Sequence, residues 1–402
     1  MDSIFSLKQV LKLCSITLRS LPHRVVASFV AIFSIACVTA VLLSVLTLIN
    51  GMSKTMEQSG LDNTLLVMRA GSISELQSVL FPMEVNIMLN HPKALRDEQD
   101  RPIYSSEMFV NAETQLPGSE EILSLALRGV SAGAANMRPD FKIEQGSYFQ
   151  SGLRQVVIGQ AIARKHPQLG VGDTIKLGGS QWQIAGIFSD NLSVFESEIW
   201  ADLSTVQNDY QRGNSIQSVR IAFADDVDIA QLQQQWDADP RLNVRVITEA
   251  LFFAQQSENV TRLMRWLGIP LALVMALGAI VAAINTMYSA IASRSTEIAV
   301  QKAMGFAPIP IASSVVFESI LLALIGGVLG VLPLYLGLND MTTATNNAAN
   351  LSQIMFNFTI SADLVGQALG IAVVIGLVGG SCRPYTLSEF RLRMHYAQPD
   401  CG

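Results

Sequence analysis

Two long apolar segments, residues 266–292 and 311–338, enclose the short polar sequence Ser-Arg-Ser-Thr-Glu-Ile-Ala-Val-Gln-Lys-Ala-Met-Gly-Phe at positions 293–306. Each apolar segment exceeds the roughly 20 residues that a helix needs to cross a bilayer core. The polar sequence is too short to fold alone, yet Arg294, Glu297 and Lys302 recur in it at near-helical spacing. The sequence therefore predicts a membrane hairpin that presents a small charged helix, over residues 293–310, at one membrane surface.

The same alternation of apolar runs and polar stretches extends over the whole chain. Half of the 402 residues are hydrophobic and 15% are charged, which is too apolar for an ordinary soluble protein and too polar for a wholly embedded one. We expect a membrane protein with four transmembrane α-helices and a large α+β outer domain, residues 50–262, inserted between the first and second helices. The predicted transmembrane helices cover residues 25–49, 263–292, 311–338 and 364–382.

The orientation follows from the basic residues beside these helices, because flanks rich in Lys and Arg remain in the cytoplasm. Three flanks are basic: residues 1–24, which have the pattern of an amphipathic helix, residues 293–310, and the tail 383–402. The short loop 339–363 contains no Lys or Arg. Both termini are therefore predicted to be cytoplasmic, and the loop 339–363 is predicted to lie outside with the 50–262 domain.

The outer domain has its clearest secondary-structure signals in the middle. Residues 174–177 and 181–188 alternate between polar and apolar around Gly178-Gly179, which predicts a β-hairpin. The preceding sequence predicts a strand over 155–159 and a short helix over 160–165. Near the end of the domain, residues 249–265 are expected to form a helix that runs into the second transmembrane segment.

Composition and motifs exclude several function classes. Residues 51–260 carry 16 Lys and Arg against 26 Asp and Glu, a net charge of 16 − 26 = −10, which argues against a nucleic-acid partner. The sequence contains no GxxxxGK[ST] phosphate loop and no paired histidines. All cysteines lie outside the outer domain, so we expect no disulfide there; they are Cys14, Cys37, Cys382 and Cys401. We predict a chain that is not an enzyme and holds no cofactor or metal.

Polar and small residues inside the predicted helices are candidates for helix contacts. Glu318 is an intramembrane ionisable residue, which by default indicates a functional site. Its position near the cytoplasmic end favours a structural pairing with Arg294 or Lys302. For Asn285, an interhelical hydrogen bond is the commonest role. Glycines four residues apart favour close helix packing, although Gly-rich helices also produce such pairs by chance; the pairs are Gly326 and Gly330, Gly366 and Gly370, and Gly376 and Gly380.

Several motifs resemble the MacB/FtsX-like ABC transporter permeases. In the membrane hairpin they are Arg294-x-x-Glu-Ile298, Lys302-Ala-Met-Gly305, Phe317-Glu318 and Gly326-Gly-Val-Leu-Gly330. In the outer domain they are Gly146-Ser-Tyr-Phe149, Val156-Val-Ile-Gly159, Leu169-Gly-Val-Gly-Asp-Thr174 and Gln183-Ile-Ala-Gly-Ile-Phe188. The resemblance covers nearly the whole chain, is specific for the family, and does not identify a substrate.

The resemblance implies an inner-membrane permease subunit with a periplasmic 50–262 domain and no ATPase domain of its own. ATP and magnesium would then bind to a separate ABC ATPase subunit, and two permease chains, alike or different, would complete the unit within the membrane lipid. It also implies that the 293–310 segment is the coupling helix that docks into the ATPase, with a periplasmic adaptor protein as partner for export. The coupling residues would be Arg294, Glu297, Ile298, Gln301, Lys302 and Gly305.

Two alternatives and one departure from the family pattern stay open. The resemblance implies mechanotransmission, in which ATP-driven closure of the ATPases moves the outer domains. That movement could instead extract lipoproteins from the inner membrane toward a carrier, or it could signal to cell-wall hydrolases. An outer domain of about 200 residues is larger than a simple activator needs, which argues against signalling by fold-level analogy. After Gly379-Gly-Ser-Cys-Arg-Pro-Tyr385 the tail differs from the short Ala- and Arg-rich end that is usual in the family.

Overall fold

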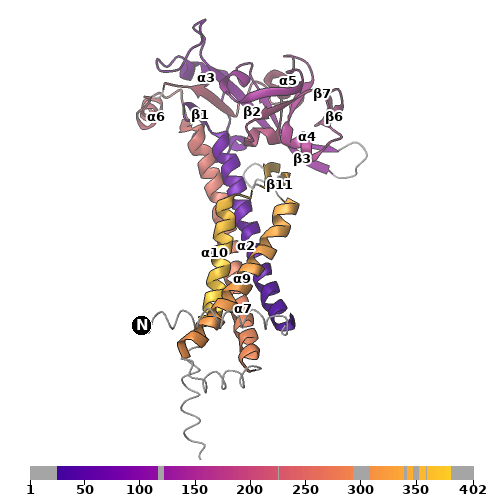
Figure 1. Cartoon of the computed structure of the whole chain (residues 1–402). Coiled ribbons are helices and arrows are strands. Elements are labelled where there is room, and N and C mark those ends of the chain that lie inside the picture. Colours follow the sequence, from indigo (N-terminus) through magenta and orange to yellow (C-terminus); the bar gives the residue numbers. More distant parts are fainter. Residues whose placement is uncertain are drawn as a thin grey trace, which may run out of the picture. The chain divides into compact units, whose positions relative to one another are not determined.

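The computed structural model describes residues 25–115, 122–224, 226–292, 308–338, 342–346, 353–358 and 360–381 (Figure 1). The chain divides into two compact units. The helical unit comprises Met1–Ile49, Leu263–Asn339 and Thr359–Gly402. The sheet unit comprises Asn50–Arg262 and Asp340–Phe358.

Four long helices in the described part of the chain are apolar enough and long enough to cross a membrane. They are α2 (Val25–Ser59), α7 (Glu249–Ala292), α9 (Pro308–Leu338) and α10 (Ala362–Ser381). The helix predicted over 249–265 is confirmed, because α7 runs without interruption from Glu249 into the second apolar segment. By contrast, α2 does not end with the apolar run at Ile49 but continues to Ser59. The last residues of α2 and the first residues of α7 therefore belong to the sheet unit.

Within the helical unit, glycines bring backbones close together. A Cβ atom on Gly326 would lie 2.8 Å from the carbonyl oxygen of Ile32, and one on Gly376 would lie 2.6 Å from the Cβ of Ala323. Gly330 contacts α2 in the same way as Gly326. Such contacts exclude larger side chains and allow the helices to pack tightly. No described residue comes within 4 Å of a Cβ on the glycines of the 366 and 370 pair, so this pair makes no such contact with the described chain.

The sheet unit is built on a ten-stranded mixed sheet in the order β10-β1-β9-β2-β3-β8-β5-β7-β4, with β6 paired to β7. Only β3 with β8 and β5 with β7 pair in parallel among these strands. The strands are β1 (Thr64–Arg69), β2 (Tyr104–Gln115), β3 (Ile122–Val130), β4 (Phe141–Gly146), β5 (Gln155–Gly159), β6 (Thr174–Leu177), β7 (Ser180–Asp190), β8 (Glu198–Asp202), β9 (Ser218–Ala222) and β10 (Val244–Thr248). The short helices are η2 (Glu75–Gln77), α3 (Pro82–Leu89), η3 (Ala135–Met137), α4 (Gln160–Lys165), η4 (Val194–Ser197), α5 (Leu203–Asp209) and α6 (Ile229–Asp237).

The predicted β-hairpin is confirmed by β6 and β7. The two strands pair antiparallel, and Leu177 stands opposite Ser180 across a two-residue turn. Gly178 has a φ of +58°, a left-handed conformation that glycine adopts without steric cost and that tight hairpin turns require. The predicted strand and helix before the hairpin are also confirmed, as β5 and α4.

The connection predicted as a short loop, residues 339–363, contains a second small sheet among its described residues. Strands β11 (Thr342–Asn346) and β12 (Gln353–Asn357) pair antiparallel. Met355 of β12 is only 2% exposed and joins the core cluster of the large sheet. Burying an apolar side chain in a core contributes about 1.5–3 kcal/mol, so β12 is held on the sheet unit at Met355.

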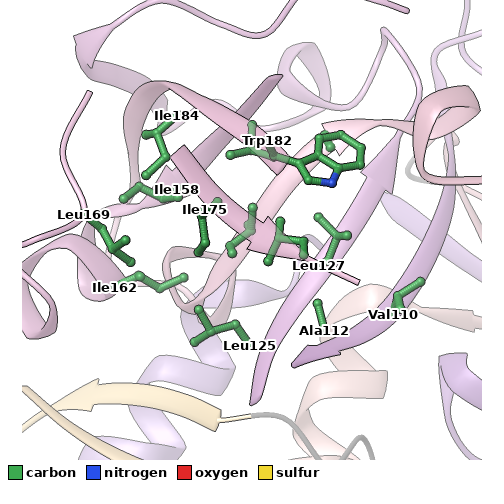
Figure 2. Close-up of a cluster of buried hydrophobic side chains, with 14 of the residues drawn as sticks. Val110, Ala112, Leu125, Leu127, Ile158, Ile162, Leu169, Ile175, Trp182 and Ile184 are labelled. Atoms are coloured by element: carbon green, nitrogen blue, oxygen red, sulfur yellow. The ribbon is translucent and has the colours of Figure 1, made fainter. Parts of the chain in front are cut away.

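One face of the large sheet forms an apolar core. Figure 2 shows this cluster, which includes Val110 of β2, Leu127 of β3, and Trp182 and Ile184 of β7. Ile162 of α4 covers the cluster together with Leu169. Because side chains alternate between the two faces of a strand, the neighbours of these core residues must point to the opposite face, and several of those neighbours are charged.

Candidate functional site

Most of the predicted coupling segment, residues 293–307, lies outside the described residues, and its last residues, 308–310, begin α9. Its members, Arg294, Glu297, Ile298, Gln301, Lys302 and Gly305, belong to the undescribed range 293–307. Their docking role therefore stays a prediction. Of the two intramembrane polar residues, Glu318 is buried in α9 with 6% of its surface exposed, whereas Asn285 is exposed on α7.

The densest group of charges in the described chain lies on the second face of the large sheet. Met108 and Leu127 belong to the apolar core, so the adjacent Glu107 and Arg128 face the other side. The register brings the charged positions of four neighbouring strands together, since Arg128 pairs with Phe109, Ser105 with Arg220 and Ala126 with Glu198. We call the whole group the ion network; it consists of Glu75, Glu107, Arg128, Arg138, Asp190, Glu198, Arg220 and Glu249.

Arg128 of β3 is the centre of the ion network and contacts three carboxylates. Its Nη1 donates to Glu75 Oε1 at 3.0 Å and to Glu107 Oε2 at 2.8 Å. Its Nε donates to Glu198 Oε2 at 2.6 Å, and its Nη2 donates to the other oxygen of Glu198 at 2.7 Å. This fork-like contact with Glu198 is the bidentate geometry that a guanidinium group offers and an ammonium group does not.

Two further arginines extend the ion network toward the long helices. Arg220 of β9 donates to Glu107 and, at 3.1 Å, to Glu75. Its Nε also donates to Glu249 Oε1 at 2.7 Å. Arg138, which follows η3, donates to the same oxygen of Glu249 at 2.6 Å and to Asp190 Oδ2 at 3.3 Å. Glu249 is the first residue of α7, where a negative charge is favoured by the helix dipole.

All eight residues of the ion network are buried, with at most 7% of each exposed. Three guanidinium groups face five carboxylates, so the fully ionised network has a net charge of 3 − 5 = −2. Burial by itself would raise the pKa of Glu75, but Arg128 and Arg220 outweigh it and hold that pKa well below its usual range. Burial opposes the charge of Arg128 too, yet Glu198 and Glu75 raise its pKa above the ordinary value. The network is therefore a set of mutually dependent charges.

The ion network is attached to the ends of α2 and α7 by direct hydrogen bonds. Arg138 Nη1 donates to the carbonyl oxygen of Ser59, the last residue of α2, at 3.3 Å. The backbone N–H of Leu61 donates to Glu249 Oε2 at 3.3 Å. Between these residues, a Cβ on Gly60 would lie 2.3 Å from the Cα of Ala250. The end of α2 and the start of α7 thus touch backbone to backbone, and the charges of the sheet hold both.

The arrangement is suited to holding parts in place, and it offers no free acid, base or nucleophile. The carboxylates of the ion network already accept hydrogen bonds from guanidinium groups. Among the described residues, no group of three or more His, Cys, Asp and Glu side chains could hold a metal ion. A buried set of directional contacts fixes the relative position of the strands and helix ends that carry it.

Sequence reasoning did not identify the ion network. The available signal was a charged residue at a position where strand alternation expects a neighbour of core residues, as in Leu125-Ala-Leu-Arg128 and Ser218-Val-Arg220. That signal indicates a buried charge but not its partner. Glu75 and Arg220, for example, are separated by 145 positions along the chain.

Two protein families match the sequence. Residues 28–239 match the MacB-like periplasmic core domain, and residues 270–382 match the FtsX-like permease C-terminal region. The first match alone covers more than half of the chain and includes seven of the eight residues of the ion network. The second covers the described helices α9 and α10 and most of the apolar part of α7.

Among characterised proteins, the chain is similar to the macrolide export ATP-binding/permease protein MacB of Rhodopseudomonas palustris (strain HaA2). The two are 26% identical over 256 residues, which are 60% of this chain and 38% of that protein. The periplasmic region of MacB from Actinobacillus actinomycetemcomitans aligns over 52% of this chain and 98% of its own, with a TM-score of 0.38 and 15% identity. The extracellular domain of the noncanonic ABC-type transporter YknZ from Gram-positive bacteria aligns over 46% and 100%, with a TM-score of 0.35 and 16% identity.

Proposed function

Because the chain belongs to the MacB/FtsX-like permeases of ABC transporters, we propose that it is a membrane subunit that converts ATP hydrolysis by a separate ATPase into movement of its sheet unit. The family implies an ABC ATPase partner, and the chain contains no phosphate-binding loop of its own. The work of such a subunit is mechanical: it receives force on the cytoplasmic side and delivers it to the periplasmic side.

One observation carries this proposal. The helices α2 and α7 continue from their apolar segments into the sheet unit, and their ends are fixed there by the ion network. A displacement along or around either helix would reach the sheet strands through Arg138 and Glu249, because buried ion pairs leave little freedom to rearrange. A flexible linker at this place would absorb the same displacement.

In the proposed cycle, the 293–310 coupling helix docks into the ATPase, and a second permease chain completes the complex. Closure of the ATPase on ATP moves the long helices, and the sheet unit then acts on a periplasmic adaptor protein that exports a compound or peptide. The related protein from Rhodopseudomonas palustris is named for macrolide export, which supports export over other outputs of the same stroke. This chain spans only 38% of that relative, so adaptor and substrate are part of the proposal.

The test is purification of the tagged full-length chain from its native membrane. We expect an ABC ATPase to copurify, together with an adaptor protein. Recovery of a lipoprotein carrier would indicate lipoprotein extraction in place of export, and recovery of a cell-wall hydrolase would indicate signalling. Recovery of no ATPase would refute the proposal.

A single charge reversal tests the coupling helix. Glu297→Lys should reduce the stimulation of the ATPase by the permease by about tenfold or more, because a reversed charge at an interface costs several kcal/mol, while membrane insertion stays normal. The matched control is Glu258→Lys on α7, where the side chain of Glu258 is 66% exposed and contacts only Arg262 among the described charges. Unchanged stimulation in Glu297→Lys would contradict the coupling role of this residue.

A further inference from the structure

A short segment that runs from the end of β7 to the start of β8, residues 190–198, contacts α2, α7 and β12. Seven of its nine residues are buried, including Val194, Phe195 and Ser197, each with at most 7% exposed. It contains the helix η4 and contributes both Asp190 and Glu198 to the ion network. We call it the relay segment.

The relay segment contacts the ends of both α2 and α7. The N–H of Val194 donates to Ser59 Oγ, at the end of α2, at 2.7 Å. The ring of Phe195 packs edge-on against Phe253 of α7 with 5.7 Å between the ring centroids. The same ring contacts the charges, with the guanidinium carbon of Arg138 3.5 Å from its centroid. One aromatic side chain therefore links the start of α7 to the ion network.

The relay segment also holds the β11–β12 hairpin, which connects α9 to α10. The hydroxyl of Ser197 accepts a hydrogen bond from the N–H of Met355 at 2.9 Å and donates to the carbonyl oxygen of Met355 at 3.1 Å. A single side chain thus satisfies both backbone groups of one residue in β12, as a neighbouring strand would. Together with the burial of the Met355 side chain, these two bonds attach the hairpin to the sheet unit.

The conformation of the relay segment is constrained from within. Asn191 and Leu192 have φ values of 50° and 59°; this left-handed conformation is tolerated by Asn but costs a residue such as Leu roughly 1–2 kcal/mol. The carboxylate of Glu196 accepts hydrogen bonds from the N–H groups of Asp190 and Leu192, both at 2.9 Å. Gly159 leaves so little space beside the segment that a Cβ there would lie 2.0 Å from the carbonyl oxygen of Glu196. Strain that the surroundings maintain in this way is typical of functional segments.

We propose that the relay segment combines the movements of the four long helices, with Ser197 as the positioning residue that ties the α9–α10 connection to the ends of α2 and α7. This inference rests on the proposed mechanical function and adds to it a specific route. The helices α2 and α7 act on the segment through Ser59 and Phe253, and the helices α9 and α10 act on it through Met355. The sheet unit then moves as one body, because the contacts that transmit the movements of all four helices converge on one stiff segment.

The first measurement needs no ATP and tests the attachment itself. In the full-length complex in nanodiscs, Ser197→Ala should speed amide hydrogen exchange in β11 and β12 about tenfold, because both hydrogen bonds to Met355 are lost. The matched control is Ser124→Ala on β3, whose hydroxyl bonds only to the Asn111 side chain among the contacts of the described chain. Unchanged exchange in Ser197→Ala would overturn the proposal.

The second measurement tests transmission. Spin labels are placed at Lys142 on β4 and Thr343 on β11, in a chain whose four native cysteines are replaced by serine. With wild-type Ser197, the distance between the labels should be the same in the resting complex and in the ATP–vanadate-trapped complex. With Ser197→Ala, the distance should shift and its distribution should broaden only in the trapped state. An unchanged distance in the trapped Ser197→Ala complex would overturn the proposal even if hydrogen exchange were faster.

The two proposals fail in different ways. If no ATPase copurifies with the wild-type chain, the mechanical function is refuted, whereas the exchange result still decides whether Ser197 holds the hairpin. If an ATPase is present and stimulated but the distance between the spin labels is the same with and without Ser197→Ala, the mechanical function stands and the proposed role of the relay segment is refuted.

Discussion

The two faces of the central strands β2, β3, β8 and β9 are both buried, but one face is lined by apolar side chains and the other by charged ones. On one face, Met108, Leu127 and Ile199 pack into an apolar cluster. On the other, Glu107, Arg128 and Glu198 form ion pairs at 2.6–2.8 Å. Both faces are equally inaccessible to water, since all six residues are at most 5% exposed.

The two faces differ in how strictly each one requires particular side-chain partners in a particular geometry. Apolar contacts are non-directional and tolerate substitutions that keep volume. A buried ion pair is seldom more stabilising than a well-packed apolar pair, but it requires particular partners in a particular geometry. The apolar face therefore stabilises the sheet, and the charged face determines where the ends of α2 and α7 attach.

The largest expected effect comes from adjacent residues on the two faces of β3. Arg128→Met leaves the buried Glu198 without an arginine partner and leaves Glu75 and Glu107 with Arg220 alone, so we expect the free energy of unfolding of the sheet unit to fall by about 3–5 kcal/mol. Leu127→Val removes one methylene from the apolar face and should cost about 1 kcal/mol. The measurement is urea denaturation of the full-length chain, followed by the fluorescence of the buried Trp182 and Trp200.

Arg128→Lys separates the effect of the charge from the effect of the guanidinium geometry. A lysine keeps the charge but cannot reproduce the bidentate contact with Glu198, so it should recover less than half of the lost stability. Equal stability of the Met, Lys and wild-type proteins would show that the charged face is not specific.

An intermediate effect is expected where the two helix ends touch. Gly60→Ala places a Cβ 2.3 Å from the Cα of Ala250 and 2.7 Å from its backbone nitrogen. Because backbone atoms cannot rotate away, the helix ends must separate, at a cost of about 1–3 kcal/mol. The same denaturation measurement applies, and stimulation of the ATPase should fall as well.

The control for this variant is Gly179→Ala in the β6–β7 turn, where no described atom lies within 4 Å of the new Cβ. Its stability should stay within about 0.5 kcal/mol of wild type. If both glycine variants behave alike, close contact at Gly60 does not matter for the attachment of the helices.

These contrasts also explain how much of the molecule could be predicted from sequence. The β6–β7 hairpin was predictable because Gly178-Gly179 and the flanking alternation are local signals. Strands β2 and β8 are not predictable in this way, because Glu107 interrupts the apolar pattern of β2 and β8 begins at Glu198. Charges normally mark a solvent-facing position, and here both are buried.

The attachment of the long helices could not be predicted for a related reason. Its contacts join residues far apart in the chain, as between Ser197 and Met355, which are separated by 158 positions. Composition indicated the apolar helices correctly, and motifs indicated the family. The position at which the helices are held depends on pairings that only the fold brings together.

The smallest effect, and the one most specific for the charged face, is its response to acid. The surrounding arginines hold the pKa of Glu75 well below its usual range in the folded protein, whereas an unfolded glutamate titrates near pH 4.3. Ionised Glu75 thus contributes stability above about pH 4.3, and this contribution is lost as the pH falls toward the folded pKa, because the unfolded chain binds the proton more tightly.

Glu75→Gln should remove this dependence. Below about pH 4, the curve of unfolding free energy against pH should be shallower than that of wild type by up to about 1.4 kcal/mol per pH unit. Glu113→Gln, on the exposed side of β2, should keep the wild-type slope, so equal slopes for all three proteins would mean that Glu75 is not ionised within the network.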